Sequence, residues 1–378
     1  MSLTVLLAVA FVGAALYYVC PLRLRWVLLL LLSYGFYLTC GLSALPFIAL
    51  TTLTTWAGAL VIARVGENGK AYLRAHKAEL TAEAKKAQKA KTRSRQRVWF
   101  FAVLLLNFGV LAVLKYLNPV MAWGASLLGG SAPSLGLVLP LGISFYTFQS
   151  MGYLIDVYNG KYAPEKNPAK FALFVSFFPQ LVAGPIVRAR DFIPQIYKTP
   201  VVTRAEFGEG LFLVLCGLFK KTVISDYISL NFVDRIFDAP LLYTGVENLL
   251  GVYGYALQIY CDFSGYSDMA IGIALLLGFR FNVNFDSPYQ SATITEFWRR
   301  WHISLSSWLK DYLYISLGGN RKGKIRTYIN LLVTMLLGGL WHGASVSFIL
   351  WGAWHGASLA VHKFMMNHFS SFKKSEAK

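Results

Sequence analysis

The chain has 378 residues, of which 56% are hydrophobic and only 14% are charged. Soluble globular domains contain about 45–50% apolar and about 25% charged residues. A water-soluble fold of this size cannot hide so much apolar surface, so the composition excludes a soluble enzyme, a nucleic-acid-binding domain and a disordered chain. It predicts one all-helical membrane domain, residues 1–378, that crosses the bilayer several times.

Ten apolar runs mark the candidate membrane segments. They cover 3–20, 26–40, 44–63, 98–117, 135–155, 169–186, 207–232, 246–278, 327–345 and 346–366. A full helical span needs about 20 residues. Some runs are shorter than this or are interrupted, so ten runs do not predict ten complete spans.

The basic residues predict the orientation. Residues 64–97 hold eleven Lys and Arg against three Glu, a net charge of +8 in a chain whose total is +18. The positive-inside rule therefore predicts that 64–97 is a cytoplasmic loop, that Met1 is outside and that the basic tail 367–378 is cytoplasmic. The composition of 73–97 favours helix and indicates a solvated extension of a helical hairpin.

The eighth apolar run is too long for one span and carries two carboxylates. Asp262 and Asp268 are costly inside a membrane unless they line a cavity or are paired. Six residues apart on one helix, they would point about 120° away from each other. We therefore expect a helix break near Gly265, with at least one Asp facing a polar cavity or paired with a basic residue such as Arg299 or Arg300. The alternative is that both cap helix ends near the interface.

The stretch 286–317 mixes Trp and Tyr with Arg, Lys and Glu and is not apolar enough to span. Aromatic and basic residues together suit the membrane–water boundary. This stretch is predicted to form one or two short interfacial or re-entrant helices.

Three histidines lie among tryptophans. A neutral imidazole such as that of His342 can accept a proton from a hydroxyl nucleophile, but it can equally be a hydrogen-bonded packing residue. The sequence WHGAS occurs at 341–345 and again at 354–358. On one continuous helix, His342 and His355 would be about 20 Å apart and about 140° apart in direction, and spacing alone does not choose between them.

His302 is predicted to face either the same cavity as His342 or the membrane interface beside Arg299 and Arg300. The chain has no HExxH, GxSxG or GxxxxGK[ST] motif. The first absence argues against a zinc hydrolase, the second against a serine hydrolase and the third against ATP-driven transport. No metal and no bound cofactor are predicted.

Seven ordered motifs carry a resemblance to a known family. They are PLGISFYTFQ at 140–149, FPQLVAGPI at 178–186, YCDFSGYSD at 260–268, FWRRWHISLS at 297–306, DYLYI at 311–315, LGGNR at 317–321 and LWHGA at 340–344. The chain resembles the membrane-bound O-acyltransferases, most closely the bacterial alginate O-acetylase branch. That group also includes peptidoglycan O-acetyl transporters and, further off, the D-alanyl transfer protein of teichoic-acid modification.

The resemblance implies roles for several residues. It makes His342 the essential histidine, His355 a secondary one and His302 the other signature polar residue. The candidate substrate-binding residues are Asn330, Trp341, Asp262, Asp268, Arg299 and Arg300. The implied fold is a ring of tilted helices around a thin centre, with a funnel that leads to the essential histidine.

The implied activity is the transfer of an acetyl group from a cytoplasmic thioester, acetyl-CoA or a carrier protein, across the bacterial inner membrane. The expected acceptor is a hydroxyl of an envelope polysaccharide or a periplasmic or extracellular SGNH-type transferase; no nucleic-acid partner is expected. Four basic residues either attract the donor's phosphates or only anchor the chain by the positive-inside rule: Arg321, Lys322, Lys324 and Arg326. The alternatives are a D-alanyl transfer protein and a polysaccharide transporter without covalent chemistry. Many alginate-type members continue with further hydrophobic helices, so the chain is expected to be a short or trimmed member.

Overall fold

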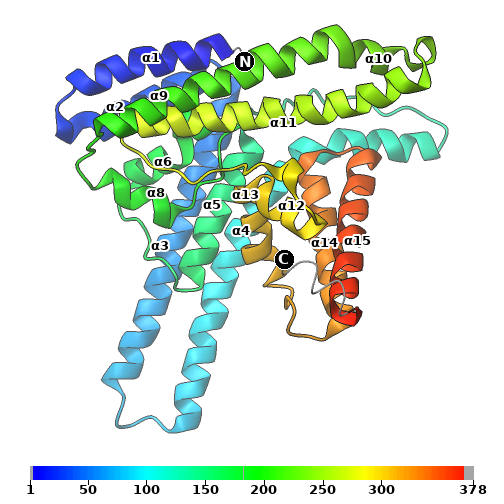
Figure 1. Ribbon diagram of the computed structural model, residues 1–378. Helices are drawn as coiled ribbons and strands as arrows, with labels where there is room; N and C mark the ends of the chain where they lie inside the picture. Colours follow the sequence, from blue (N-terminus) through cyan, green and yellow to red (C-terminus); the bar gives the residue numbers. More distant parts are fainter. Residues whose placement is uncertain (1–2, 182, 370–378) are drawn as a thin grey trace. The chain divides into compact units, whose positions relative to one another are not determined.

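The computed structural model describes residues 3–181 and 183–369 (Figure 1). Regular structure in these residues is entirely helical, which confirms the predicted class. They form two compact units, each built from two separate stretches of chain. Unit 1 contains Met1–Leu42 and Ser176–Asp286, and unit 2 contains Ser43–Val175 and Ser287–Lys378. Most of the predicted basic tail, from residue 370 onward, lies outside the described residues.

Unit 1 is dominated by two long helical stretches that lie side by side. Its α-helices are α1 (Leu3–Val19), α2 (Arg25–Leu38), α7 (Phe178–Leu181), α8 (Ala189–Ile196), α9 (Arg204–Leu218), α10 (Asp234–Asp238) and α11 (Gly245–Leu276). Two π-helices, Phe219–Asp226 and Ser229–Val233, follow α9, and short 3₁₀ turns occur at Leu22–Leu24 and Pro240–Leu242. Both long stretches start at a capping box, with Thr203 and Thr244 as the first residues of the two boxes. The side chain of each threonine accepts a hydrogen bond from the backbone N–H of the Glu three residues ahead, and the carboxylate of that Glu accepts one from the backbone N–H of the threonine.

Glycines bring α9 and α11 into close contact. A Cβ placed on Gly217 would lie 2.5 Å from the carbonyl oxygen of Gly265, and one on Gly272 would lie 2.5 Å from that of Gly210. The predicted break near Gly265 is therefore wrong, because α11 continues without interruption from Gly245 to Leu276. Gly265 lets two backbones approach each other, as small residues do between membrane helices, instead of ending the helix.

Unit 2 holds the remaining helices. They are α3 (Leu45–Ala75), α4 (Ala82–Leu127), α5 (Ile143–Tyr158), α6 (Pro168–Ser176, whose last residue falls in unit 1), α12 (Ile294–Arg300), α13 (Ile303–Trp308), α14 (Lys324–His342) and α15 (Val346–His368). Short 3₁₀ turns at Leu42–Ala44 and Pro288–Gln290 and a π-helix at Leu309–Tyr314 complete the element order. The stretch predicted to hold short helices thus consists of α12, α13 and the π-helix.

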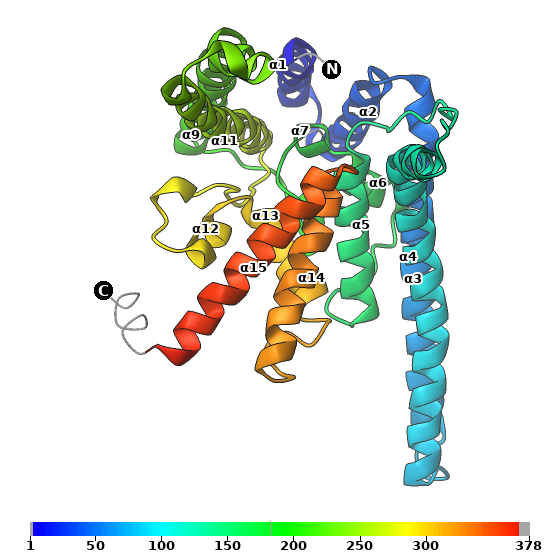
Figure 2. The same cartoon turned by 90° about the vertical axis from the view of Figure 1, so that its right-hand side faces the viewer.

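A long antiparallel hairpin of α3 and α4 extends beyond the end of α5 (Figure 2). This confirms that the predicted hairpin continues as helix past the apolar runs. In the described part of the chain, these two helices, taken as Leu42–Ala75 and Ala82–Leu127, are long and apolar enough to cross a membrane, whereas α1 is apolar but shorter. The side chain of Thr81 begins α4 by accepting a hydrogen bond from the backbone of Ala84.

Helices α14 and α15 pack tightly at glycines. A Cβ on Gly339 would lie 2.2 Å from the carbonyl oxygen of Phe348, and one on Gly352 would lie 2.5 Å from that of Met335. Gly339, three residues before His342, therefore admits a neighbouring backbone.

Candidate active site

His342 is the last residue of α14, and its side chain is exposed. Its ring lies 4.9 Å from the rings of both Trp341 and Trp351, and it runs nearly parallel to the ring of Phe348 at 6.1 Å. A side chain on Gly343 would collide with the Phe348 ring, only 2.1 Å from the ideal Cβ position. Among the described residues none hydrogen-bonds to the imidazole, so its nitrogens are open to a ligand.

The two histidines singled out as catalytic candidates contact the same tryptophan. His302 is buried, 1% exposed, and its ring lies 6.0 Å from that of Trp341. It has a left-handed backbone (φ 43°, ψ 56°) where α12 ends and α13 begins. Such a conformation is strained for a residue with a Cβ, and strain of this kind clusters at functional sites. The structure therefore brings His302 and His342 together around Trp341.

Residues of α4 hold the end of α14 from the side. Lys115 donates a hydrogen bond from Nζ to the carbonyl oxygen of Trp341, and the hydroxyl of Tyr116 donates to that of Leu340. The last carbonyls of a helix lack partners within the helix, and a cation there complements the helix dipole. Lys115 was not among the predicted site residues, although a lone lysine inside the apolar run 98–117 is a visible signal.

Helix α5 connects two of the motifs that carry the resemblance. Phe148 packs against Trp308 at 4.2 Å and against Trp341 at 5.7 Å. Its carbonyl oxygen also accepts a hydrogen bond of 2.9 Å from the indole nitrogen of Trp308. The 140–149 motif thus forms part of the wall behind Trp341.

The chain breaks between the two WHGAS copies, with α14 ending at His342 and α15 beginning at Val346. The two histidines therefore do not lie on one helix. The Trp351 ring contacts both, at 4.9 Å from His342 and 4.7 Å from His355. His355 also meets Trp298 at 5.1 Å, so it lies behind the aromatic layer that borders His342.

Asn330 is buried two turns into α14, at 1% exposure. Its side-chain nitrogen donates to the carbonyl oxygen of Gly319 at 3.0 Å, and its own carbonyl accepts from Thr334 at 2.6 Å. In this structure Asn330 fixes the turn that leads into α14.

A cavity of about 300 Å³ lies beside α14, at the lower end of the size range of small-molecule sites. Its apolar wall includes Trp298 and Met335, and its cationic residues are Arg299, Lys310 and Lys363. The exposed basic residues Arg321, Lys322, Lys324 and Arg326 are not among the residues that line it. Arg300 forms an ion pair with Glu296 at 2.8 Å and does not line it either.

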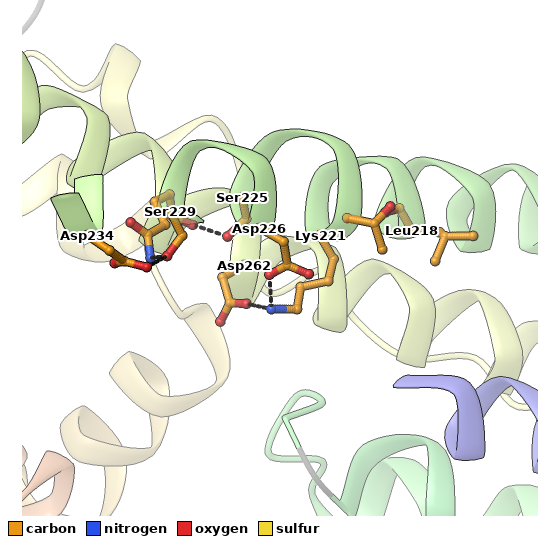
Figure 3. Close-up of polar contacts among 9 residues, drawn as sticks. Leu218, Lys221, Ser225, Asp226, Ser229, Asp234 and Asp262 are labelled. Carbon is orange, nitrogen blue, oxygen red and sulfur yellow. Dashed lines mark hydrogen bonds and ion pairs between the residues drawn. The ribbon is translucent and has the colours of Figure 1, made fainter. Parts of the chain in front are cut away.

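Asp262 and Asp268 belong to unit 1 and have other partners than predicted. Lys221 bridges Asp262 and Asp226 at 2.5 and 2.7 Å (Figure 3). Lys220 bonds Asp268 at 2.6 Å. The expectation that at least one carboxylate pairs with a basic residue is confirmed, but the partners are Lys220 and Lys221 and not the two arginines given as examples. Both carboxylates point instead to the two consecutive lysines of the π-helix after α9, which accounts for their different directions on α11.

The geometry of unit 2 suits chemistry on an anionic substrate. An accessible imidazole can take a proton from a hydroxyl, and a second imidazole lies across Trp341. The cation-lined cavity meets α14 at Thr334 and Met335, about 10 Å along the helix from His342.

A match to a known protein family shows what this chain is related to. The model of the membrane-bound O-acyltransferase family matches residues 163–377, more than half of the chain. The chain belongs to this family. The match includes the α14–α15 break and both WHGAS copies.

Three relatives show the range of this family. The chain is 43% identical to the probable alginate O-acetylase AlgI of Pseudomonas syringae pv. tomato, over 92% of this chain and 63% of that protein. It is 39% identical to the peptidoglycan O-acetyltransferase of Helicobacter pylori, over 74% and 58% of the two chains. It is 30% identical to the teichoic acid D-alanyltransferase of Bacillus subtilis, over 56% and 55%. The chain thus spans less than two thirds of the length of these relatives.

Proposed function

We propose that this protein is a membrane-bound O-acetyltransferase that moves an acetyl group from acetyl-CoA to a hydroxyl of an envelope polysaccharide, or to a partner transferase outside the cytoplasm. The observation that carries this proposal is the accessible imidazole of His342 at the end of α14, with His302 on the same tryptophan. The names of two relatives, a probable alginate O-acetylase and a peptidoglycan O-acetyltransferase, support the choice of acetyl as the transferred group.

In the proposed reaction, His342 acts as general base. It takes the proton of the acceptor hydroxyl while the hydroxyl oxygen attacks the thioester carbonyl carbon. The C–S bond then breaks, the new ester forms, and the proton passes to the leaving thiolate. His302 is proposed to stabilise the oxyanion, and Trp341 to position the acceptor. General-base and oxyanion contributions are typically worth about 10²–10⁴-fold each.

The donor is proposed to bind in the cavity lined by Arg299, Lys310 and Lys363. Its phosphates would meet these cations, while the apolar wall takes the uncharged arm. The four exposed basic residues before and at the start of α14 would act only through long-range attraction. Asn330 is proposed to position α14, not to touch substrate, since its amide is already bonded to Gly319.

The proposed setting is the bacterial inner membrane, with Met1 outside and both 64–97 and the tail in the cytoplasm. The helices would surround a thin centre, with a funnel to His342 open to each side. The acetyl group would cross there and pass to the polysaccharide or to an SGNH-type partner.

The decisive experiment uses the purified full chain and acetyl-labelled acetyl-CoA. We expect time-dependent release of CoA and label transfer in the wild type, loss of transfer by at least 10²-fold in His342→Ala, and substantial transfer in a folded His355→Ala variant. Elution profile and thermal unfolding in detergent report folding of both variants.

The same assay separates the alternatives. Transfer only from a D-alanyl carrier protein would identify the D-alanyl reaction, and transport of intact substrate without thioester cleavage would identify a transporter. An active His342→Ala variant beside a folded but inactive His355→Ala variant would contradict the proposed base.

A further inference from the structure

A second cavity, of about 590 Å³, lies away from the histidines, where the hairpin of α3 and α4 meets the loop after α5. Its lining includes Lys70 on α3, Lys89 and Arg93 on α4, and Tyr158 at the end of α5. One carboxylate, that of Glu67, also lines it, so its charged residues carry a net charge of +2.

The walls of this cavity are held in place by packing. A Cβ on Gly66 would lie 2.6 Å from the Gln96 side chain, and one on Gly69 would lie 2.4 Å from Thr92. Gln96 in turn donates to the carbonyl oxygen of Ile62 at 2.9 Å. The two helices therefore close tightly on one side and leave the cavity on the side of the loop.

Arg93 is oriented before any ligand arrives. Its Nη1 donates to the carbonyl oxygen of Tyr158 at 2.7 Å, and its guanidinium lies 3.6 Å from the centre of the Tyr158 ring. That ring is stacked on Phe100 at 4.3 Å. By contrast, Lys70 and Lys89 are exposed and form no ion pair among the described residues. The cavity thus offers two exposed ammonium groups beside one guanidinium that is held by Tyr158.

The depth of the cavity relative to the apolar runs points to its ligand. These runs end at Ala63 on α3 and begin at Val98 on α4. At 1.5 Å per residue, Gly66 lies about 5 Å, Arg93 about 8 Å and Lys70 about 10 Å beyond the apolar layer. The polar headgroup region of each leaflet is about 5–8 Å thick, and lysine side chains reach back toward it.

We propose that this cavity binds the phosphate headgroup of an anionic phospholipid, with its acyl chains in the adjoining apolar layer. Basic pockets between membrane helices on the cytoplasmic side suit such headgroups, and Tyr158 and Tyr162 suit the interface. A free phosphate ester shares this chemistry, but the depth of the cavity favours the lipid. The site is separate from the acyl-transfer chemistry.

The test titrates phosphatidylglycerol into the detergent-purified full chain and follows bound lipid by native mass spectrometry and the thermal unfolding midpoint. The test variant is Lys70→Gln with Lys89→Gln. The matched control is Lys86→Gln with Lys91→Gln, which removes two exposed charges of the same hairpin that do not line the cavity. Phosphatidylcholine and soluble glycerol phosphate are the comparison ligands.

Each basic residue near an anionic surface contributes about a five-fold gain in affinity, so the test variant should bind phosphatidylglycerol about 30-fold more weakly. The control should retain most of its affinity, and phosphatidylcholine should bind weakly to all three proteins. Equal losses in the test and control variants would overturn the site. If glycerol phosphate stabilises the chain as much as phosphatidylglycerol does, and the test variant loses this effect, then the ligand is a soluble phosphate ester and the proposal of a lipid is overturned.

Discussion

Two consecutive lysines of unit 1 differ in the number of carboxylates that they pair with, and this number should decide how much each carboxylate contributes to stability. Lys221 is shared by Asp226 and Asp262, whereas Lys220 has the single carboxylate partner Asp268. All of these groups are at least partly removed from solvent. Removing one partner from a partly buried pair leaves the other charge uncompensated, which costs more than the pair itself contributes.

We therefore expect unequal effects from two similar substitutions. Asp268→Asn should lower the free energy of unfolding by about 1–3 kcal/mol, because it strands Lys220. Asp262→Asn should cost less than about 1 kcal/mol, because Asp226 still pairs with Lys221. Thermal unfolding in a single detergent measures both, with the exposed Asp238→Asn as the control. A larger loss for Asp262→Asn would contradict the pairing.

The sequence indicated that the carboxylates of Asp262 and Asp268 are costly inside an apolar segment, but it did not indicate their partners. Burial of a carboxylate in an apolar run predicts that some cation lies nearby, and this is confirmed. Which cation depends on the packing of elements more than 40 residues apart, which no local pattern contains. Lys220 and Lys221 were themselves a visible signal, because they interrupt the apolar run 207–232, but that run does not show that they face α11.

Among the helices, the packing of α9 on α11 depends on glycine. At Gly217 the ideal Cβ position lies 2.5 Å from a backbone oxygen and 2.8 Å from Met269, and neither a backbone nor a packed side chain yields easily. At Gly208, in the same helix, nothing lies within 4 Å.

Gly217→Ala should consequently destabilise the protein by about 1–3 kcal/mol, the usual range for overpacking. Gly208→Ala should be neutral or stabilising by up to about 1 kcal/mol, because alanine favours helix. The comparison of thermal unfolding midpoints needs no functional assay. Similar midpoints for the two variants would contradict the close approach of the helices.

The existence of the helices was largely predictable, because apolar runs and caps are local. The continuity of α11 through Gly265 was not predictable from the sequence. Glycine weakens an isolated helix, which suggested a break at Gly265, but a neighbouring backbone that packs on the glycine more than compensates. The break after His342 has the opposite origin: the backbones of Gly343 and Ser345 are extended, and the next helix starts only at Val346. The proximity of His302 to Trp341 arises from chain segments nearly 40 residues apart and needed the structure.

At the scale of the whole molecule, the charge on the α3/α4 hairpin predicts its side of the membrane. A cysteine at Lys86 should resist an impermeant thiol reagent in intact cells and react after permeabilisation. A cysteine at the exposed Leu42, between α2 and α3, should react in intact cells. The parent chain supplies the background from its four native cysteines. Ready labelling at position 86 in intact cells would reverse the orientation.

The turn at 76–81 joins α3 and α4. Helix α3 continues about 18 Å past the end of its apolar run before it reaches this turn, and α4 runs back beside it. Because exposed loop tips tolerate insertions and the flanking helices are continuous, a folded marker spliced into this turn would move as one body with unit 2. Such a marker would give a small membrane protein a recognisable landmark for single-particle imaging. It would lie at the end of the hairpin, clear of both cavities and of His302, His342 and His355.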